Sequence, residues 1–149
     1  MSAATPPLRR RTRNVVRLLL AVFALVAILS SCTPQQAQVT SLVNRSRAGA
    51  GVHALRQNLN LDAKAQGWAE HLSRQGQLSH STLSSGVNYP FRLLGENVGY
   101  GGSIEQVHQA FLNSPGHRAN IMDRQFDFIG TGVAYGRGRV WVVQVFMDL

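Results

Sequence analysis

The feature that most constrains the fold is a strand-like segment near the C-terminus, residues 140–146, with the sequence VWVVQVF. It is rich in β-branched and aromatic residues, which favour strands. Because successive side chains of a strand point to opposite faces, both faces of this segment are apolar. The apolar residues are Val140, Trp141, Val142, Val143, Val145 and Phe146. A strand that is apolar on both faces requires cover above and below its sheet.

Other segments complete the expected architecture. Residues 128–135 have a similar composition and are separated from residues 140–146 by GRGR, so we predict a hairpin. Apolar residues at helical spacing predict a helix over about residues 36–47, a longer one from a cap at Asn60 or Asp62 to a stop near Gly76, and a further helix that begins at Ser103 and ends at Pro115. Helices on both sides of this hairpin make an α+β fold, a three-layer α-β-α sandwich with a mainly antiparallel central sheet.

Two shorter segments carry more local predictions. Residues 89–94, YPFRLL, are expected to form a helical turn. Residues 114–117, SPGH, fit a type II turn, because Pro115 fixes φ and Gly116 accepts a positive φ. Such a turn would hold His117 in a defined direction.

The N-terminus has the pattern of an export signal. Five arginines between Arg9 and Arg17 precede an apolar run over residues 18–29. The 12 apolar residues of this run fall short of the length of about 20 that spans a bilayer as a helix, although Val15 and Val16 extend the stretch and leave a retained anchor as an alternative. We therefore predict that residues 1–31 are a lipoprotein signal peptide.

Cys32, the only cysteine, follows Leu29, Ser30 and Ser31, and this pattern resembles the lipobox of bacterial lipoproteins. We expect Cys32 to be lipidated, with residues 32–38 as a polar tether and residues 39–149 as a single domain. The alternative is a lone thiol at the edge of the signal. Once acylated, Cys32 leaves no thiol for disulfides, metal binding or nucleophilic catalysis.

The net charge argues against nucleic acid as a partner. The whole chain has 15 basic and 7 acidic side chains and a formal charge of +8, but five of the arginines lie in the predicted signal. Removal of the signal leaves 10 basic and 7 acidic side chains, a charge of +3. Nucleic-acid binding needs a clustered basic face, and the remaining basic residues are scattered. We expect a monomer that contacts the membrane through its lipid.

Five short motifs occur in a fixed order. They are LSHS at residues 78–81, GENVGYG at 95–101, FLNSPGHRANIM at 111–122, IGTGVAY at 129–135 and VWVVQVF at 140–146. Together they resemble the CAP superfamily of cysteine-rich secretory, antigen 5 and pathogenesis-related 1 proteins, also called SCP-like domains. The resemblance covers about residues 39–149, and the export signal points to a bacterial member of the lipoprotein type. It implies the same three-layer sandwich.

The resemblance also implies a cleft lined by two histidines and two glutamates. Three of these residues match in this chain, namely His80, Glu96 and His117. The second glutamate has no match in the stretch that precedes the second histidine. Glu105 is a substitute candidate, but it lies two residues after Ser103 in the first turn of a predicted helix, where the helix dipole already favours an acidic side chain.

Two imidazoles and a carboxylate are a plausible set for zinc or another divalent cation, weakly bound, with one position open for water. The separations of 16 residues between His80 and Glu96 and 21 between Glu96 and His117 lend the metal no independent support. In the alternative interpretation, Glu96 binds neighbouring loop backbone and the two histidines are its partners. Arg118 and Asn120 are then expected to hold their own segment.

The sequence specifies no reaction. It lacks the GxSxG elbow, a phosphate-binding glycine loop and GxGxxG. The first hypothesis is therefore a non-enzymatic domain, exported and anchored to the outer face of the cell membrane, that binds a hydrophobic small molecule or another envelope component. The alternatives are a metal-dependent hydrolase that uses His80, Glu96 and His117, a glycosidase that uses Glu96 and Glu105, and a structural or host-interaction protein with a vestigial cleft.

Overall fold

The computed structural model describes residues 32–149, and residues 1–31, with the predicted signal peptide, lie outside the described residues. Residues Cys32–Leu149 form one compact unit. None of the helices in residues 32–149 combines the length and apolarity needed to cross a bilayer.

The domain is built on a four-stranded sheet with the strand order β1-β3-β4-β2. The strands are β1 (Arg56–Gln57), β2 (Leu93–Gly101), β3 (Phe128–Gly136) and β4 (Arg139–Asp148). Strand β1 runs parallel to β3, and the other two pairs are antiparallel. Strands β3 and β4 form the predicted hairpin, closed by Arg137 and Gly138, which both have positive φ as a tight two-residue turn requires.

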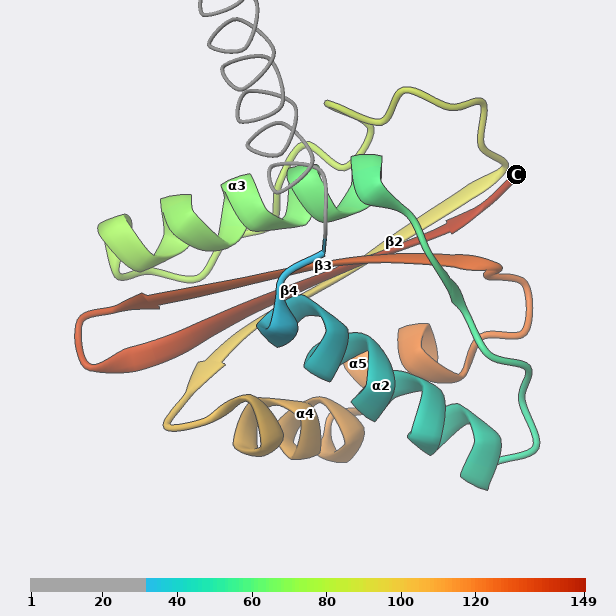
Figure 1. The fold of residues 1–149 in the computed structure, drawn as a ribbon, viewed down its shortest axis with the longest axis horizontal. Helices are drawn as coiled ribbons and strands as arrows, with labels where there is room; N and C mark the ends of the chain where they lie inside the picture. Colours follow the sequence, from blue (N-terminus) through green and yellow to red (C-terminus); the bar gives the residue numbers. More distant parts are fainter. Residues whose placement is uncertain (1–31) are drawn as a thin grey trace, which may run out of the picture. The chain divides into compact units, whose positions relative to one another are not determined.

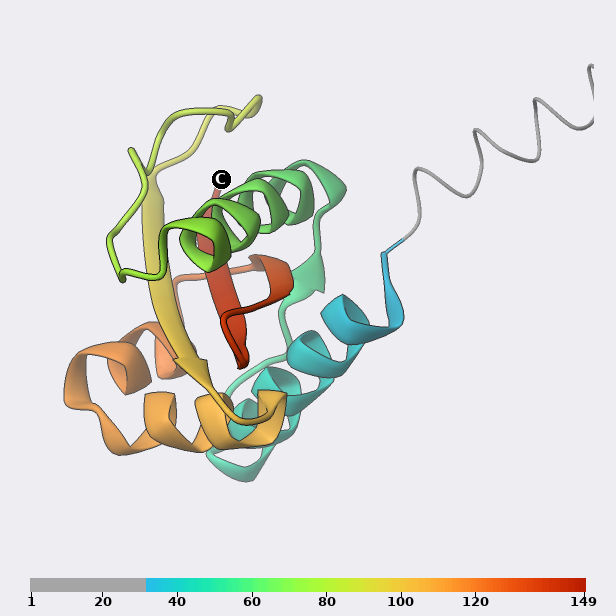
Figure 2. The ribbon, with the colours of Figure 1, turned by 90° about the vertical axis from the view of Figure 1, so that its left-hand side faces the viewer.

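Helices cover both faces of the sheet, as Figures 1 and 2 show. Helix α3 (Leu59–Gln75) lies alone on one face. The opposite face carries α2 (Pro34–Gly49), α4 (Ile104–Asn113) and α5 (Pro115–Met122). This arrangement confirms the three-layer α-β-α sandwich with a mainly antiparallel sheet.

Strand β4 supplies core residues to both layers, as its sequence predicts. One cluster joins it to α3 and contains Leu61, Ala65, Ala69, Leu72, Trp141, Val143, Val145 and Met147. The other joins it to α2, α4 and α5 and contains Val39, Val43, Val107, Phe111, Val140, Val142 and Phe146. The alternation of the strand therefore divides its side chains between two cores.

Helix α3 approaches β3 closely because two glycines of β3 face it. A Cβ added to Gly130 would lie 2.1 Å from the backbone carbon of Leu61, and one added to Gly132 would lie 2.2 Å from the backbone oxygen of Ala65. Any side chain at these positions would push the helix outward. The glycines of the IGTG motif thus set the distance between two layers.

The first helix begins earlier than the sequence analysis predicts. Helix α2 begins at Pro34, and Thr33 caps it through a capping box with Gln36. Residues 34–38, predicted as a polar tether, are therefore helical, and this part of the prediction is wrong. The physical reason is local: Pro fits the first helical position, and the Thr33 and Gln36 side chains satisfy free backbone amides.

Two further local predictions are also wrong. Residues 89–94 do not form a helical turn, and Leu93 instead begins β2. Residues 114–117 do not form a type II turn, because α5 begins at Pro115 with Ser114 at its N-cap position, and Gly116 is not among the glycines with positive φ. Pro115 does end α4, but it also begins α5, since its fixed φ suits a first helical position.

Candidate functional site

Glu96 of strand β2 is the centre of a polar cluster. Its side chain is only 3% exposed. Oε1 accepts hydrogen bonds from His80 Nδ1 at 2.8 Å and from the backbone amide of Ser81 at 2.9 Å. Oε2 accepts a third from the Ser81 hydroxyl at 2.6 Å. Both carboxylate oxygens are therefore bound by the loop that carries the LSHS motif.

The strand itself explains why Glu96 faces this loop. Val98, two residues further along β2, packs in the cluster on the α3 side of the sheet. Residues two apart in a strand point to the same face, so Glu96 also points toward the α3 side. The loop over residues 77–92 leaves the end of α3 and returns to β2, and it passes this face. Glu96 thus lies where it can hold the loop.

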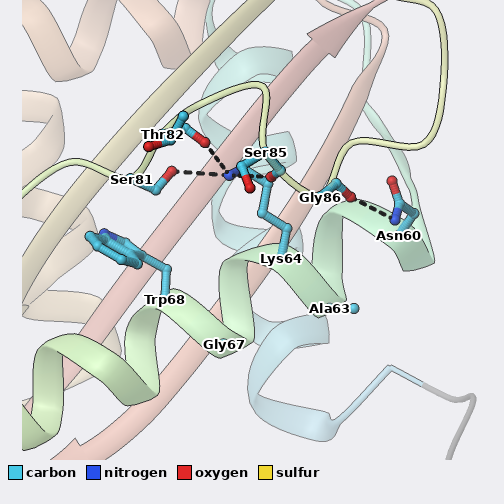
Figure 3. A pocket seen from close by; sticks show the side chains of 9 residues that line it. All are labelled: Asn60, Ala63, Lys64, Gly67, Trp68, Ser81, Thr82, Ser85 and Gly86. Atoms are coloured by element: carbon cyan, nitrogen blue, oxygen red, sulfur yellow. Dashed lines mark hydrogen bonds between the residues drawn. The ribbon is translucent and has the colours of Figure 1, made fainter.

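Lys64 of α3 holds the same loop from the other side. Its Nζ donates to the Ser81 hydroxyl at 3.1 Å, to the Thr82 carbonyl at 3.1 Å and to the Ser85 carbonyl at 2.9 Å. Figure 3 shows the ammonium directed at these three residues. Burial lowers the pKa of Lys64, and the negative charge of Glu96 partly opposes this shift. Sequence reasoning missed Lys64, whose only signal is its place beside the apolar stripe of α3.

His117, the third predicted cleft residue, lies on α5. Its ring contacts Phe111, with 4.9 Å between the ring centroids. Burial lowers the pKa of His117, and the nearby His80 lowers it further. The sequence analysis expects His117 to line one cleft with His80 and Glu96, and this expectation stays a prediction. Within residues 32–149, however, no hydrogen bond joins His117 to the Glu96 carboxylate.

Two asparagines fasten α5 to β2 beside the cluster. Asn97 donates from Nδ2 to the His117 carbonyl at 3.1 Å. Asn120 donates from Nδ2 to Asn97 Oδ1 at 2.9 Å and to the Glu96 carbonyl at 3.3 Å. Asn120 therefore positions its own segment, in agreement with the role that the sequence analysis assigns to it.

The donor atoms do not fit a metal ion in this arrangement. No three His, Cys, Asp or Glu side chains in residues 32–149 are grouped as a metal ion requires. The lone pairs of the Glu96 carboxylate already accept three hydrogen bonds from His80 and Ser81. A carboxylate has about four lone-pair positions, so one position, on Oε2, is left to a metal ion unless it displaces a donor.

Glu105 belongs to a different part of the structure. It lies in the first turn of α4, which Ser103 caps. Its own backbone amide and the Ser103 hydroxyl lower the pKa of Glu105, and its carboxylate also accepts from Gln38 Nε2. None of these partners belongs to the Glu96 cluster. Glu105 is thus a helix-terminal residue, as the sequence analysis proposes, rather than a second cleft carboxylate.

The remaining histidines have structural partners. His108 is buried, with Nε2 2.8 Å from the Ser46 hydroxyl, while Nδ1 has no hydrogen-bond partner in the described domain. Burial lowers the pKa of His108. His53 Nε2 lies 2.9 Å from the Phe126 carbonyl. His71 stacks on Trp68 with 4.6 Å between ring centroids.

Cys32 lies at the start of the described domain and is partly buried. Gln57 Nε2 lies 2.8 Å from its Sγ, and burial raises the pKa of the thiol. One residue, Thr33, separates Cys32 from helix α2. A group attached to this sulfur would therefore be held directly against the folded domain.

A pocket of about 490 Å³ lies between α3 and the loop over residues 77–92. Its lining consists of Asn60, Ala63, Lys64, Gly67, Trp68, Ser81, Thr82, Ser85 and Gly86. Ser81 and Lys64 belong to both the pocket and the Glu96 cluster. The sequence analysis missed this pocket, because its two walls are far apart along the chain.

Comparison with known proteins identifies the fold and its relatives. The model of the cysteine-rich secretory protein family, CAP, matches residues 40–146. The uncharacterized protein YkwD of Bacillus subtilis strain 168 is 27% identical over 124 residues. An extracellular protein of Bacillus anthracis that contains an SCP domain is 25% identical, with a TM-score of 0.68 over 80% of this chain. An outer surface protein of Borrelia burgdorferi is 21% identical, with a TM-score of 0.65 over 75% of this chain.

The relatives differ in length from this chain. The alignments cover 77% of this chain but 48% of YkwD, and 45% of the Bacillus anthracis protein. The chain therefore spans about half the length of these two relatives. The alignment with the Borrelia burgdorferi protein covers 90% of that protein.

Proposed function

The chain belongs to the CAP family of cysteine-rich secretory proteins, and from that membership we propose that it is an extracytoplasmic, lipid-anchored binding module without catalytic activity. The observation that carries this proposal is the state of Glu96, whose two carboxylate oxygens are both occupied by donors of the same chain. It is the only carboxylate of this sequence that matches the cleft pattern of the family. The cluster therefore holds a loop in place.

Catalysis would make a different demand on Glu96. A general base must reach the proton that it abstracts, at a distance of about 2.6–3.2 Å, with a lone pair available. In the described domain, His80 and Ser81 occupy three of the about four lone-pair positions of this carboxylate and leave one, on Oε2. A binding surface makes no such demand, since it benefits from a loop that is already rigid. This reasoning favours binding over hydrolysis.

The lipid anchor and the cellular location of the domain are supported by different observations. Cys32 is the only cysteine, follows the lipobox-like residues 29–31, and directly precedes the capped helix α2. The Bacillus anthracis and Borrelia burgdorferi relatives are an extracellular and an outer surface protein. We therefore propose that the domain lies on the outer face of the cell membrane and that its folded part begins directly after the lipidated Cys32.

Fractionation of cells that express the full chain tests the anchor. The Cys32→Ala variant is expected to leave the membrane fraction, because the thioether to the lipid can no longer form. Thr33→Ala is a matched control that removes the cap of α2 and leaves the cysteine in place. If the Cys32→Ala variant stays in the membrane fraction while both chains are made in equal amounts, the lipid anchor is refuted.

Capture of envelope compounds tests the binding role. The full chain is immobilised, incubated with a lipid and glycan extract of the envelope, and the retained compounds are identified by mass spectrometry. Wild type is expected to retain a defined compound. Ser81→Ala is expected to retain less, since this hydroxyl donates to Glu96 and accepts from Lys64 and both bonds are lost. Glu105→Gln serves as the control. An empty result for wild type would refute the binding role.

A further inference from the structure

The pocket between α3 and the loop over residues 77–92 has an unusual floor. Gly67 lies in the middle of α3 and has no positive φ. A Cβ added to Gly67 would meet no atom within 4 Å, so no close packing requires a glycine there. A glycine inside a helix is less favourable than an alanine. What Gly67 provides is open space, together with Ala63 one turn before it.

The wall of the pocket is an aromatic ring held in one orientation. Trp68 donates from Nε1 to the Ser79 carbonyl at 2.9 Å. His71 stacks on it with an interplanar angle of 16°, so one face of the indole is covered. Trp68 also lines the pocket (Figure 3), and His71 does not. The indole also packs against the buried cluster between α3 and the sheet, so the part of it that lines the pocket is held in place and available to a ligand.

The polar donors of the pocket are already engaged by groups of the same chain. Lys64 is the cation among its lining residues, and all three Nζ hydrogens have acceptors on the loop. The amide of Asn60 is also committed, to the Gly86 carbonyl at 3.0 Å and the Asn88 amide at 3.0 Å. Lys64 thus has no N–H group left to donate to an anion in this pocket.

The loop side of the pocket, by contrast, carries two hydroxyl groups without a partner in the described domain. Thr82 and Ser85 are exposed and line the pocket. Their backbone carbonyls accept from Lys64, which fixes the loop, and within residues 32–149 neither hydroxyl has a hydrogen-bond partner. Two uncommitted hydroxyls on a loop whose backbone is held, in the same pocket as Trp68, suit a ligand that is itself rich in hydroxyl groups.

We propose that this pocket binds one ring of a neutral saccharide, with the ring stacked on Trp68 over Gly67 and its hydroxyls bonded to Thr82 and Ser85. The polarised C–H groups on one side of a sugar ring are attracted to the negative face of an indole. The volume of about 490 Å³ lies within the range of about 300–1,000 Å³ that is usual for ligand pockets. This inference rests on the proposed binding role and gives it a ligand class.

The test uses the full chain, purified in a detergent without a sugar headgroup. Chitotriose and cellotriose are titrated separately by calorimetry, with octanoate as an apolar, anionic comparator. Trp68 is partly exposed and the other tryptophan, Trp141, is fully buried, so a change of tryptophan emission reports on the pocket. At least one saccharide is expected to bind in the millimolar range or tighter and to change the emission.

Variants decide whether the binding occurs in this pocket. Gly67→Val and Trp68→Ala are each expected to weaken saccharide binding by about tenfold or more, which corresponds to about 1.4 kcal/mol. Gly49→Val is the matched control, because Gly49 is also helical, has open space around its Cβ and lies outside the pocket. Since Trp68→Ala also removes packing, Gly67→Val carries the test if that variant unfolds.

Three outcomes would overturn the proposal: no binding of either saccharide at millimolar concentration, saccharide binding that Gly67→Val leaves unchanged, or tighter binding of octanoate than of both saccharides. Failure here is distinguishable from failure of the binding role. If the envelope extract still yields a retained compound while both saccharides fail, the ligand class is wrong and the binding role stands.

Discussion

Replacement of Glu96 by glutamine is the sharpest test of the loop clamp. Glutamine keeps the shape of the side chain and removes its charge. The carbonyl oxygen of the new amide can still accept from His80 and from the Ser81 backbone amide, but the other carboxylate oxygen becomes an NH₂ group. That group cannot accept from the Ser81 hydroxyl, which now has to turn and accept. The substitution thus weakens two bonds and reverses a third.

The magnitude follows from the three contacts. A hydrogen bond to a charged group contributes about 1.5–3 kcal/mol and a neutral one about 0.5–1.5 kcal/mol, so loss of the charge costs about 1 kcal/mol per bond. The three bonds that Glu96 accepts do not add fully because they share one side chain. We expect Glu96→Gln to lower the free energy of unfolding by about 1–3 kcal/mol, with a fall in Tm of about 4 °C for each kcal/mol.

Chemical denaturation of the wild type and Glu96→Gln measures this difference. Hydrogen exchange locates it, because the Ser81 amide donates to Glu96 and should lose protection while the amides of β4 keep theirs. Glu105→Gln is the control, since that carboxylate is exposed and its loss should destabilise the domain less than Glu96→Gln and leave the protection of the Ser81 amide unchanged. If Glu96→Gln unfolds within about 0.5 kcal/mol of wild type and Ser81 stays protected, the idea that Glu96 clamps the loop is refuted.

The remaining predictions concern pH, packing and metal. Burial lowers the pKa of His108, so the contribution of its neutral form to stability is complete above the ordinary pKa of about 6.5 and is lost as the pH falls through the pKa of the folded protein. His108→Gln should therefore reduce the loss of unfolding free energy between about pH 7 and 5. An unchanged dependence of the unfolding free energy on pH would contradict this. Gly132→Ala should destabilise the domain by about 3 kcal/mol, because its Cβ would lie 2.2 Å from a backbone oxygen of α3. Gly67→Ala should stabilise the domain by about 0.5–1 kcal/mol. If Gly132→Ala and Gly67→Ala shift Tm in the same direction in thermal unfolding, the packing argument is refuted. Zinc titrated by calorimetry should bind weakly at most, with similar heats for wild type and the His80→Ala, His117→Ala double variant; stoichiometric binding that the double variant loses would contradict the donor geometry.

Much of the fold could be predicted because it rests on local patterns. The alternation in residues 140–146 divides side chains between two faces in any strand, whatever packs on them. The capping box of Thr33 and Gln36 is equally local and open to prediction, but the polar composition of residues 33–38 also suits a tether. The prediction for residues 114–117 is wrong for another reason, since Pro and Gly suit both a type II turn and the start of a helix.

The sequence by itself determined the family and the sandwich and predicted His80, Glu96 and His117 as cleft residues, because short motifs and side-chain periodicity are properties of neighbouring residues. Only the tertiary structure decided which contacts the side chain of Glu96 makes. The bonds from His80 and Ser81 to Glu96 span 16 and 15 residues, and those from Lys64 to the loop span 17 to 21. Such bonds depend on the path of a loop between a helix and an edge strand. The pocket over Gly67 exists for the same reason, since the loop that α3 and β2 hold in place forms its second wall.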